Sequence, residues 1–373
     1  MMWLAWRQFR IQASIAFAAL AVLAVVFAVT GPGLSSRYGT SGVVGCQSAA
    51  CSTLASNFLA ELHADSVYPL LYELSIAIIL LTPAIIGLFW GAPLIAREVE
   101  TGTYRLAWNQ SVTRTRWLVI KFGLTGLAAM VVTEGLSLMQ AWWAAPIGRA
   151  VGLGGSGAAF GSQWSNALIF ATHGITPLGY AAFAFALGAT CGALIRRSIP
   201  AMAVTLAIFA FVQIAVPLWV RPNLFPAHHT TVTAGRDISF TTGTQGNFAL
   251  TTGSLPGQPG AWVLSSGAVN AAGHPVSVIP AACTQAVLNG SGASGLNCLA
   301  SNGIRIAASY QPASRDWPLQ WAETAIYLAF ALALIGFCFW RLRPPGRVRN
   351  RTLCRRECPW PGRRCRLRCR LSG

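Results

Sequence analysis

The side chains best suited to polar chemistry gather in one short stretch, residues 96–116. Charged residues make up only 10% of the chain. Five of them lie within 19 consecutive positions, namely Arg97, Glu98, Glu100, Arg105 and Arg114. No phosphate loop, paired-carboxylate site or nucleic-acid-binding motif accompanies them. So dense a cluster of charges marks a polar segment in an otherwise apolar chain.

A short amphipathic helix is expected inside this stretch. Thr103 follows Gly102, and a threonine there favours a helix start because its hydroxyl accepts a hydrogen bond from a free first-turn N–H. From that start Tyr104 and Trp108 share one face, while Arg105 lies on a neighbouring face. We expect about two helical turns lying along a membrane surface, anchored by Tyr104 and Trp108.

The stretch lies between two apolar runs, 67–95 and 117–145, and each is long enough to cross a bilayer. The chain is 54% hydrophobic with a mean hydropathy of +0.52, which is typical of membrane proteins. We therefore predict an all-α polytopic membrane protein with six transmembrane helices. The predicted spans are 11–30, 67–95, 117–145, 167–195, 199–220 and 321–340.

Basic residues predict the orientation of these spans. Nine lie near spans in the N-terminus, the 96–116 stretch with Lys121, and the Arg196–Arg197 turn, against two in the segments around Arg37 and Arg149. Positive charge favours the cytoplasmic side, so both termini and residues 96–116 are predicted to be cytoplasmic. Residues 221–320 then form an extracytoplasmic loop between spans five and six. Short alternating runs bounded by Gly and Pro predict that it is β-rich or irregular.

The net charge of +17 does not indicate a nucleic-acid partner. Twelve of the 27 basic residues lie between Arg341 and Arg370. This segment, 341–373, is rich in Arg and Cys and has almost nothing apolar to bury, so we expect it to be disordered. It is either a basic tail attracted to anionic lipid or a product of another reading frame.

Four cysteines, Cys46, Cys51, Cys283 and Cys298, fall in segments predicted to be outside, where oxidation is permitted. Pairing 46 with 51 and 283 with 298 is one of the three connectivities that four cysteines allow. No metal site is expected. The four tail cysteines have a short central gap and flanking arginines, which oppose a bound dication.

The chain is not expected to be an enzyme. A nucleotide-binding phosphate loop needs Gly-Lys followed by Ser or Thr. The single lysine, Lys121, stands between Ile120 and Phe122. A Gly-x-Ser-Gly match at 154–157 lies in a glycine-rich loop, which disfavours a strained catalytic turn.

A family resemblance rests on the polar stretch and the start of span three. The residues that carry it are Glu98, Glu100, Gly102, Thr103, Leu106, Ser111, Val112, Thr113, Arg114 and Lys121. They resemble the membrane subunit of bacterial ABC-2-type transporters, in which an acidic residue, a Gly-Thr pair, a short turn ending in Arg and a basic residue open the third membrane helix. Many relatives carry a proline before the turn, where this chain has Asn109 or Ser111.

The resemblance implies a permease subunit in the bacterial cytoplasmic membrane. Two copies would surround a path, and a separate ABC ATPase carrying ATP and Mg²⁺ would dock on residues 96–116, so this chain would hold no cofactor of its own. Glu98, Glu100 and Arg105 would make polar contacts with the ATPase, while Gly102 and Thr103 would shape the turn. The family is associated mainly with export of drugs, lipids or polysaccharides.

Glu134, near the middle of span three, must face protein, water or a partner, because a carboxylate is costly in hydrocarbon. It either lines the transport path or hydrogen-bonds a neighbouring helix. The polar stretch itself has a simpler interpretation, a basic loop that only sets orientation. The alternative for the whole chain is a non-transport membrane sensor or adhesion protein that acts through the 221–320 loop.

Overall fold

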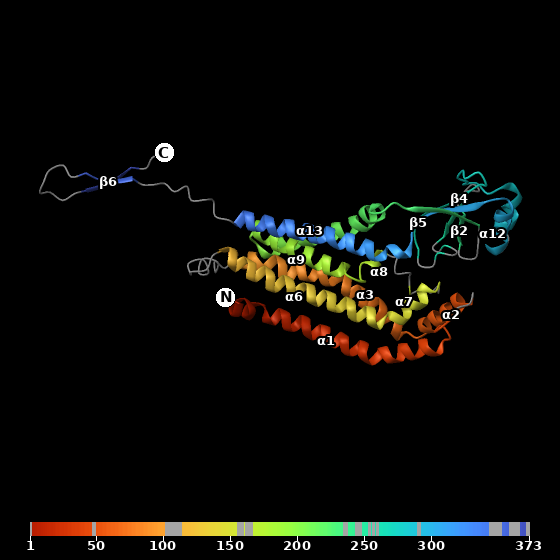
Figure 1. Cartoon of the computed structure of the whole chain (residues 1–373), viewed down its shortest axis with the longest axis horizontal. Helices are drawn as coiled ribbons and strands as arrows, with labels where there is room; N and C mark the ends of the chain where they lie inside the picture. The colour runs from red at the N-terminus through yellow and green to blue at the C-terminus, as the bar shows by residue number, and fades with distance from the viewer. Residues whose placement is uncertain are drawn as a thin grey trace.

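A bundle of long helices carries a small β-rich module at one end, as the computed structural model shows (Figure 1). The structure describes residues 2–46, 50–100, 114–154, 160, 167–233, 238–242, 248–252, 255, 258, 261–288, 292–342, 353–357 and 366–370. We call the end of the bundle where residues 100 and 114 lie the connector end. The opposite end, which bears the β-rich module, is the sheet end.

Six helices within the described residues are long and apolar enough to cross a membrane, which confirms the predicted architecture. Three of them are single helices in the spanning part, α1 (Met2–Thr40), α6 (Arg114–Trp143) and α9 (Thr176–Ile195). Span two joins α3 (Val67–Ile86), the π-helical turn η1 (Gly87–Gly91) and α4 (Ala92–Glu100). Span five joins α10 (Ser198–Ala215), η2 (Val216–Val220) and η3 (Arg221–Asn223), and span six is α13 (Asp316–Leu342), which follows the short turn η6 (Ala313–Arg315).

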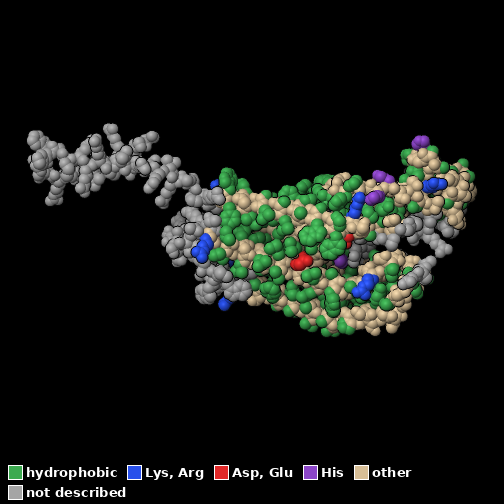
Figure 2. All heavy atoms as spheres, in the orientation of Figure 1, with side chains coloured by type: hydrophobic (Ala, Val, Ile, Leu, Met, Phe, Trp, Pro, Cys, Tyr) green, Lys and Arg blue, Asp and Glu red, His purple; other side chains and the backbone are tan. Residues whose placement is uncertain are grey.

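Helix α9 forms the centre of the bundle. In its most apolar window 72% of residues are buried, against 11% in α1. A helix that is apolar on all sides is expected to be surrounded by other helices, whereas α1 leaves most of its surface for lipid or another chain. Figure 2 shows hydrophobic side chains spread over the flank of the bundle, with Lys and Arg side chains toward its two ends. Such a flank suits a hydrocarbon environment.

At the sheet end, segments predicted as loops are partly helical. Helix α1 continues to Thr40, and α2 (Cys51–Ala64) and α7 (Ala145–Gly152) cover the end of the bundle. A disulfide joins Cys46 to Cys51 just before α2. Span four begins later than predicted, since the short helix α8 (Ala167–Phe170) is separated from α9 by a turn in which Gly174 has a φ of 63°. Only glycine adopts that conformation readily.

The module between spans five and six is β-rich, with two helices against its sheet. Its described strands are β1 (His228–Thr233), β2 (Ile238–Thr242), β3 (Phe248–Thr252), β4 (Trp262–Val269) and β5 (Arg305–Gln311). An antiparallel sheet of order β1-β5-β4 and a β2–β3 hairpin result. Between β4 and β5 lie η5 (Ala281–Cys283), α11 (Thr284–Leu288) and α12 (Gly292–Ser301).

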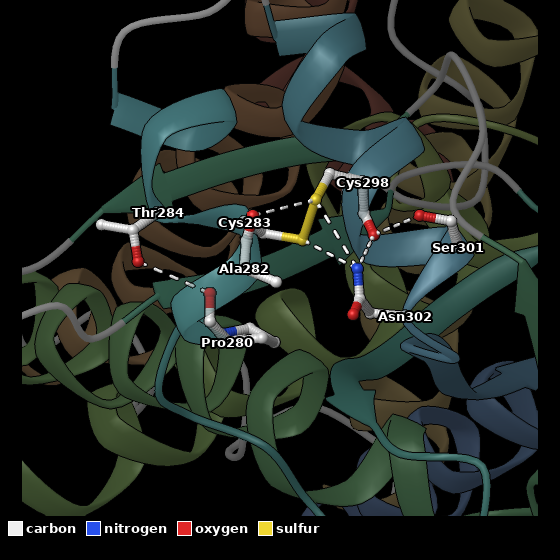
Figure 3. The surroundings of a disulfide bond; sticks show 7 residues. All are labelled: Pro280, Ala282, Cys283, Thr284, Cys298, Ser301 and Asn302. Atoms are coloured by element: carbon white, nitrogen blue, oxygen red, sulfur yellow. Dashed lines mark hydrogen bonds between the residues drawn. A yellow bond between two sulfur atoms is a disulfide. The ribbon is translucent and has the colours of Figure 1, made fainter.

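A second disulfide holds this helical segment together, joining Cys283 to Cys298 (Figure 3). The amide of Asn302 donates to the carbonyl of Cys298 at 2.9 Å and lies against the sulfur atoms. Below the module, the Gln311 amide donates to the Phe225 carbonyl at 2.8 Å. The two chain segments that connect the module to the bundle are thereby held side by side.

Two short segments of the tail are described, and both are strands. Strands β6 (Leu353–Glu357) and β7 (Arg366–Arg370) pair as an antiparallel ribbon in which Cys354 is the register partner of Cys369. Arginines alternate with Leu367 and Cys369 in β7, and a two-stranded ribbon of this kind is marginally stable in water.

Candidate functional site

The connector end contains a polar junction built on the last turns of α4. Glu98 pairs with Lys121 of α6, and both side chains are largely buried, at 15% and 10% exposure. Glu98 Oε2 is buried without a hydrogen-bond partner among the described residues. An ion pair removed from water to this degree is costly to break, because either charge alone would be left poorly solvated. This pair therefore fixes the end of span two to the start of span three.

Glu100 makes the second contact of the junction, with the start of span five. Its carboxylate accepts a hydrogen bond from the backbone N–H of Ser198 at 2.8 Å and one from the Ser198 hydroxyl at 2.7 Å. Both bonds favour the charged carboxylate and lower the pKa of Glu100, and nearby Arg197 adds to this effect. The N–H of a first helical residue has no partner within its own helix, so Glu100 caps α10 from another element.

Close glycine contacts place α4 against span four. An ideal Cβ on Gly188 would lie 2.2 Å from the Gly87 carbonyl oxygen, and one on Gly192 would lie 2.2 Å from that of Ala92. Only glycine fits at such separations, so the two backbones touch. Close approach through small residues is the usual way in which membrane helices gain packing energy. The junction is thus attached to spans three, four and five.

The structure places only part of the predicted coupling residues. Arg97 and Glu100 are exposed on α4, the Glu98 side chain is largely buried, and the two carboxylates are engaged within the chain. Gly102, Thr103, Tyr104, Arg105 and Trp108, and with them the predicted amphipathic helix, lie outside the described residues. Arg114 begins α6, although its side chain is outside the described part.

Exposed arginines surround the junction, namely Arg97, Arg116, Arg196 and Arg197. Arg196 ends α9 in the left-handed conformation, with φ 57° and ψ 16°. Glycine is the usual residue at such a helix end, and a side chain there costs about 1 kcal/mol. The chain therefore keeps a guanidinium at this surface despite a less favourable backbone.

Glu134 lies half-buried on α6, and its Oε2 is buried without a partner among the described residues. Both amide atoms of Gln140, farther along the same helix, are buried in the same state. Span three therefore carries buried polar atoms that have no hydrogen-bond partner among the described residues. Among the described residues no group of three His, Cys, Asp or Glu could hold a metal ion.

A buried charged cluster toward the sheet end was missed by the sequence reasoning. Arg221 of η3 donates to Glu323 of α13 through Nε at 2.8 Å, and the two are 1% and 0% exposed. Tyr180 of α9 donates to the same carboxylate at 2.5 Å. The guanidinium also lies 4.1 Å from the centre of the Phe170 ring. The usable signal was an Arg ending span five and a Glu opening span six, since consecutive antiparallel spans bring these ends to the same level.

Six apolar spans, with α9 at their centre and a polar junction at one end, define a multi-pass membrane protein. The chain belongs to the ABC-2 membrane transporter related family, whose model matches residues 17–221. The match covers the whole junction, spans two to four, and most of spans one and five. It makes the chain a membrane component of that transporter class, a family that works in general with an ATPase subunit. No curated protein and no solved structure matches the chain.

Proposed function

We propose that this chain is the permease subunit of an ABC-2-type transporter in a bacterial cytoplasmic membrane, and that a separate ATPase docks on residues 96–116. The family match over residues 17–221 is the observation that supports it. ATP binding would draw two ATPases together and push the two coupling segments. The spans would then shift between two packings, moving substrate across the membrane.

Further observations are consistent with this function. The exposed arginines around the junction suit an acidic surface on the ATPase. The apolar, little-buried flank of α1 leaves room for a second copy of the chain and for lipid. Glu134 and Gln140 are buried polar groups in span three, and we propose that this part of the bundle borders the transport path.

Co-purification tests the proposal. The full chain is expressed with the ATPase encoded beside its gene, extracted in mild detergent and captured by a tag on the chain. We expect the ATPase to be retained, and its hydrolysis of ATP to rise roughly tenfold in the complex. The double variant Arg97→Ala, Arg105→Ala should lose most of the retained ATPase.

The matched control is Glu61→Ala, because Glu61 is an exposed carboxylate on α2 at the sheet end. It should retain the ATPase as the unaltered chain does. A chain that retains no ATPase, or a double variant that retains it fully, would contradict docking on residues 96–116.

A further inference from the structure

Two carboxylates at the end of α4 contact two different spans. Glu98 contacts α6 through Lys121, and Glu100 contacts α10 through Ser198. Residues two apart on a helix point to different sides, so one short segment can hold two neighbours at once. The residue that follows Glu100 opens the 101–113 segment. A displacement of the end of α4 would therefore act on both contacts.

The two contacts differ in how easily they can change. Glu98 and Lys121 are withdrawn from water, so separating them would leave charges poorly solvated. Glu100 is exposed, and its hydrogen bonds to Ser198 can exchange for bonds to water at little cost. The first contact behaves as a fixed pivot on span three. The second is a link that can open and close.

The link acts on a helix that leads directly to the other end of the bundle. Helix α10 continues through η2 into η3, where Arg221 is bound to Glu323 of span six. If span five moves as one body, a shift at Ser198 reaches that cluster and the start of the β-rich module.

We propose that Glu100 is a positioning residue that transmits displacement of the end of α4 to span five through Ser198, and that it does not itself dock the ATPase. This inference rests on the proposed function. Glu98 in turn keeps the end of α4 fixed to span three through Lys121. Docking then falls to other residues of the 96–116 stretch, such as Arg97.

Glutamine separates transmission from docking. In Glu100→Gln the Oε1 atom can still accept from the Ser198 N–H, and the new amide can donate to the Ser198 hydroxyl, while the charge is lost. A link made by hydrogen bonds survives this change. A contact with basic groups of the ATPase would not survive it, and Glu100→Gln would then behave as Glu100→Ala does.

The test compares Glu100→Ala, Glu100→Gln and the control Glu61→Ala in the full chain purified with its ATPase. We expect Glu100→Ala to retain the ATPase within about twofold of the unaltered chain, while stimulated ATP hydrolysis falls roughly tenfold. Glu100→Gln should keep stimulation within about threefold of the unaltered chain, and Glu61→Ala should change nothing. Loss of ATPase binding in Glu100→Ala, or equal failure of the Gln and Ala variants, overturns the proposal.

A second measurement uses the chain without ATPase. Hydrogen exchange of the first-turn amides of α10, at Ser198, Ile199 and Ala201, should be roughly tenfold faster in Glu100→Ala and close to normal in Glu100→Gln. Unchanged exchange in Glu100→Ala overturns the link even where the ATPase binds normally. Failure of the unaltered chain to capture an ATPase, in contrast, overturns the proposed function and leaves the exchange result as a separate finding.

Discussion

At the scale of single residues, the buried charges of Arg221 and Glu323 are met by several partners at once. Glu323 receives hydrogen bonds from Arg221 and from Tyr180, and the guanidinium also lies over an aromatic ring. A carboxylate and a guanidinium with this many partners can remain charged in apolar surroundings. Because the three residues come from three spans, the cluster fixes the relative positions of spans four, five and six.

Removal of one member of this pair should be strongly destabilising. In Glu323→Gln the buried Arg221 loses its counter-charge, and breaking a buried pair in this way costs about 3–5 kcal/mol. We expect a clear fall in the thermal midpoint of the detergent-solubilised chain and a lower yield. The double variant Arg221→Met, Glu323→Leu leaves no buried charge and should recover most of the loss. A single variant as stable as the unaltered chain would show that the pair is dispensable.

His173 should make stability depend on pH. Burial lowers the pKa of its imidazole below the usual 6.5, an effect that a hydrogen bond with the Ile169 carbonyl partly offsets. The folded chain then binds this proton less readily than the unfolded chain, so stability is full above about pH 6.5 and falls as the pH drops toward the folded pKa. Thermal midpoints between pH 5 and 8 would measure the fall. His173→Asn should remove the contribution of His173 to this pH dependence. An unchanged dependence of the thermal midpoint on pH in that variant would show that other groups cause it.

At the scale of elements, backbone contact between spans two and four holds the junction in place. Gly188 and Gly192 lie one helical turn apart on α9 and face carbonyls of η1 and α4. The π-helical turn η1 lies at this contact, and its wider backbone hydrogen-bonding pattern locally widens the helix of span two. Span two therefore approaches span four most closely at Gly188 and Gly192, where α9 has no side chains.

Alanine at these glycines should force the two spans apart. A Cβ on Gly188 or Gly192 would lie 2.2 Å from a backbone oxygen, and overpacking of this kind costs about 1–3 kcal/mol or more. Gly123→Ala on α6 and Gly336→Ala on α13 are matched controls, since nothing lies within 4 Å of a Cβ at either position. We expect lower thermal midpoints for Gly188→Ala and Gly192→Ala only. Equal behaviour of all four variants would disprove the close contact.

The existence of the spans could be predicted from the sequence, but their partners could not. A helix needs about 20 apolar residues to cross a bilayer, and runs of that length can be read directly from the sequence. The ends of the helices depend on local packing, so α1 extends to Thr40 and α9 begins only at Thr176. Glu100 and Ser198 are 98 positions apart, and no local pattern joins them. The Gly-x3-Gly spacing at 188 and 192 was a usable signal for helix contact.

At the scale of the whole molecule, the polar junction and the β-rich module are far apart. The junction lies at one end of the bundle and the β-rich module at the other, with the spans between them (Figure 1). If the junction receives an ATPase, it must face the cytoplasm, and the module must then lie outside. The disulfide between Cys283 and Cys298 agrees with that placement, because such bonds persist in oxidising surroundings.

Labelling of intact cells tests this orientation. Ser265→Cys on β4 and Arg116→Cys at the start of α6 both change exposed residues, at the sheet end and the connector end. The four tail cysteines are first changed to Ser, while Cys191 and Cys338 are buried. A membrane-impermeant maleimide should label Ser265→Cys in intact cells and Arg116→Cys only after permeabilisation. The reverse pattern would place the junction outside the cell, where no ATPase could reach it, and the permease mechanism proposed for this chain would be excluded.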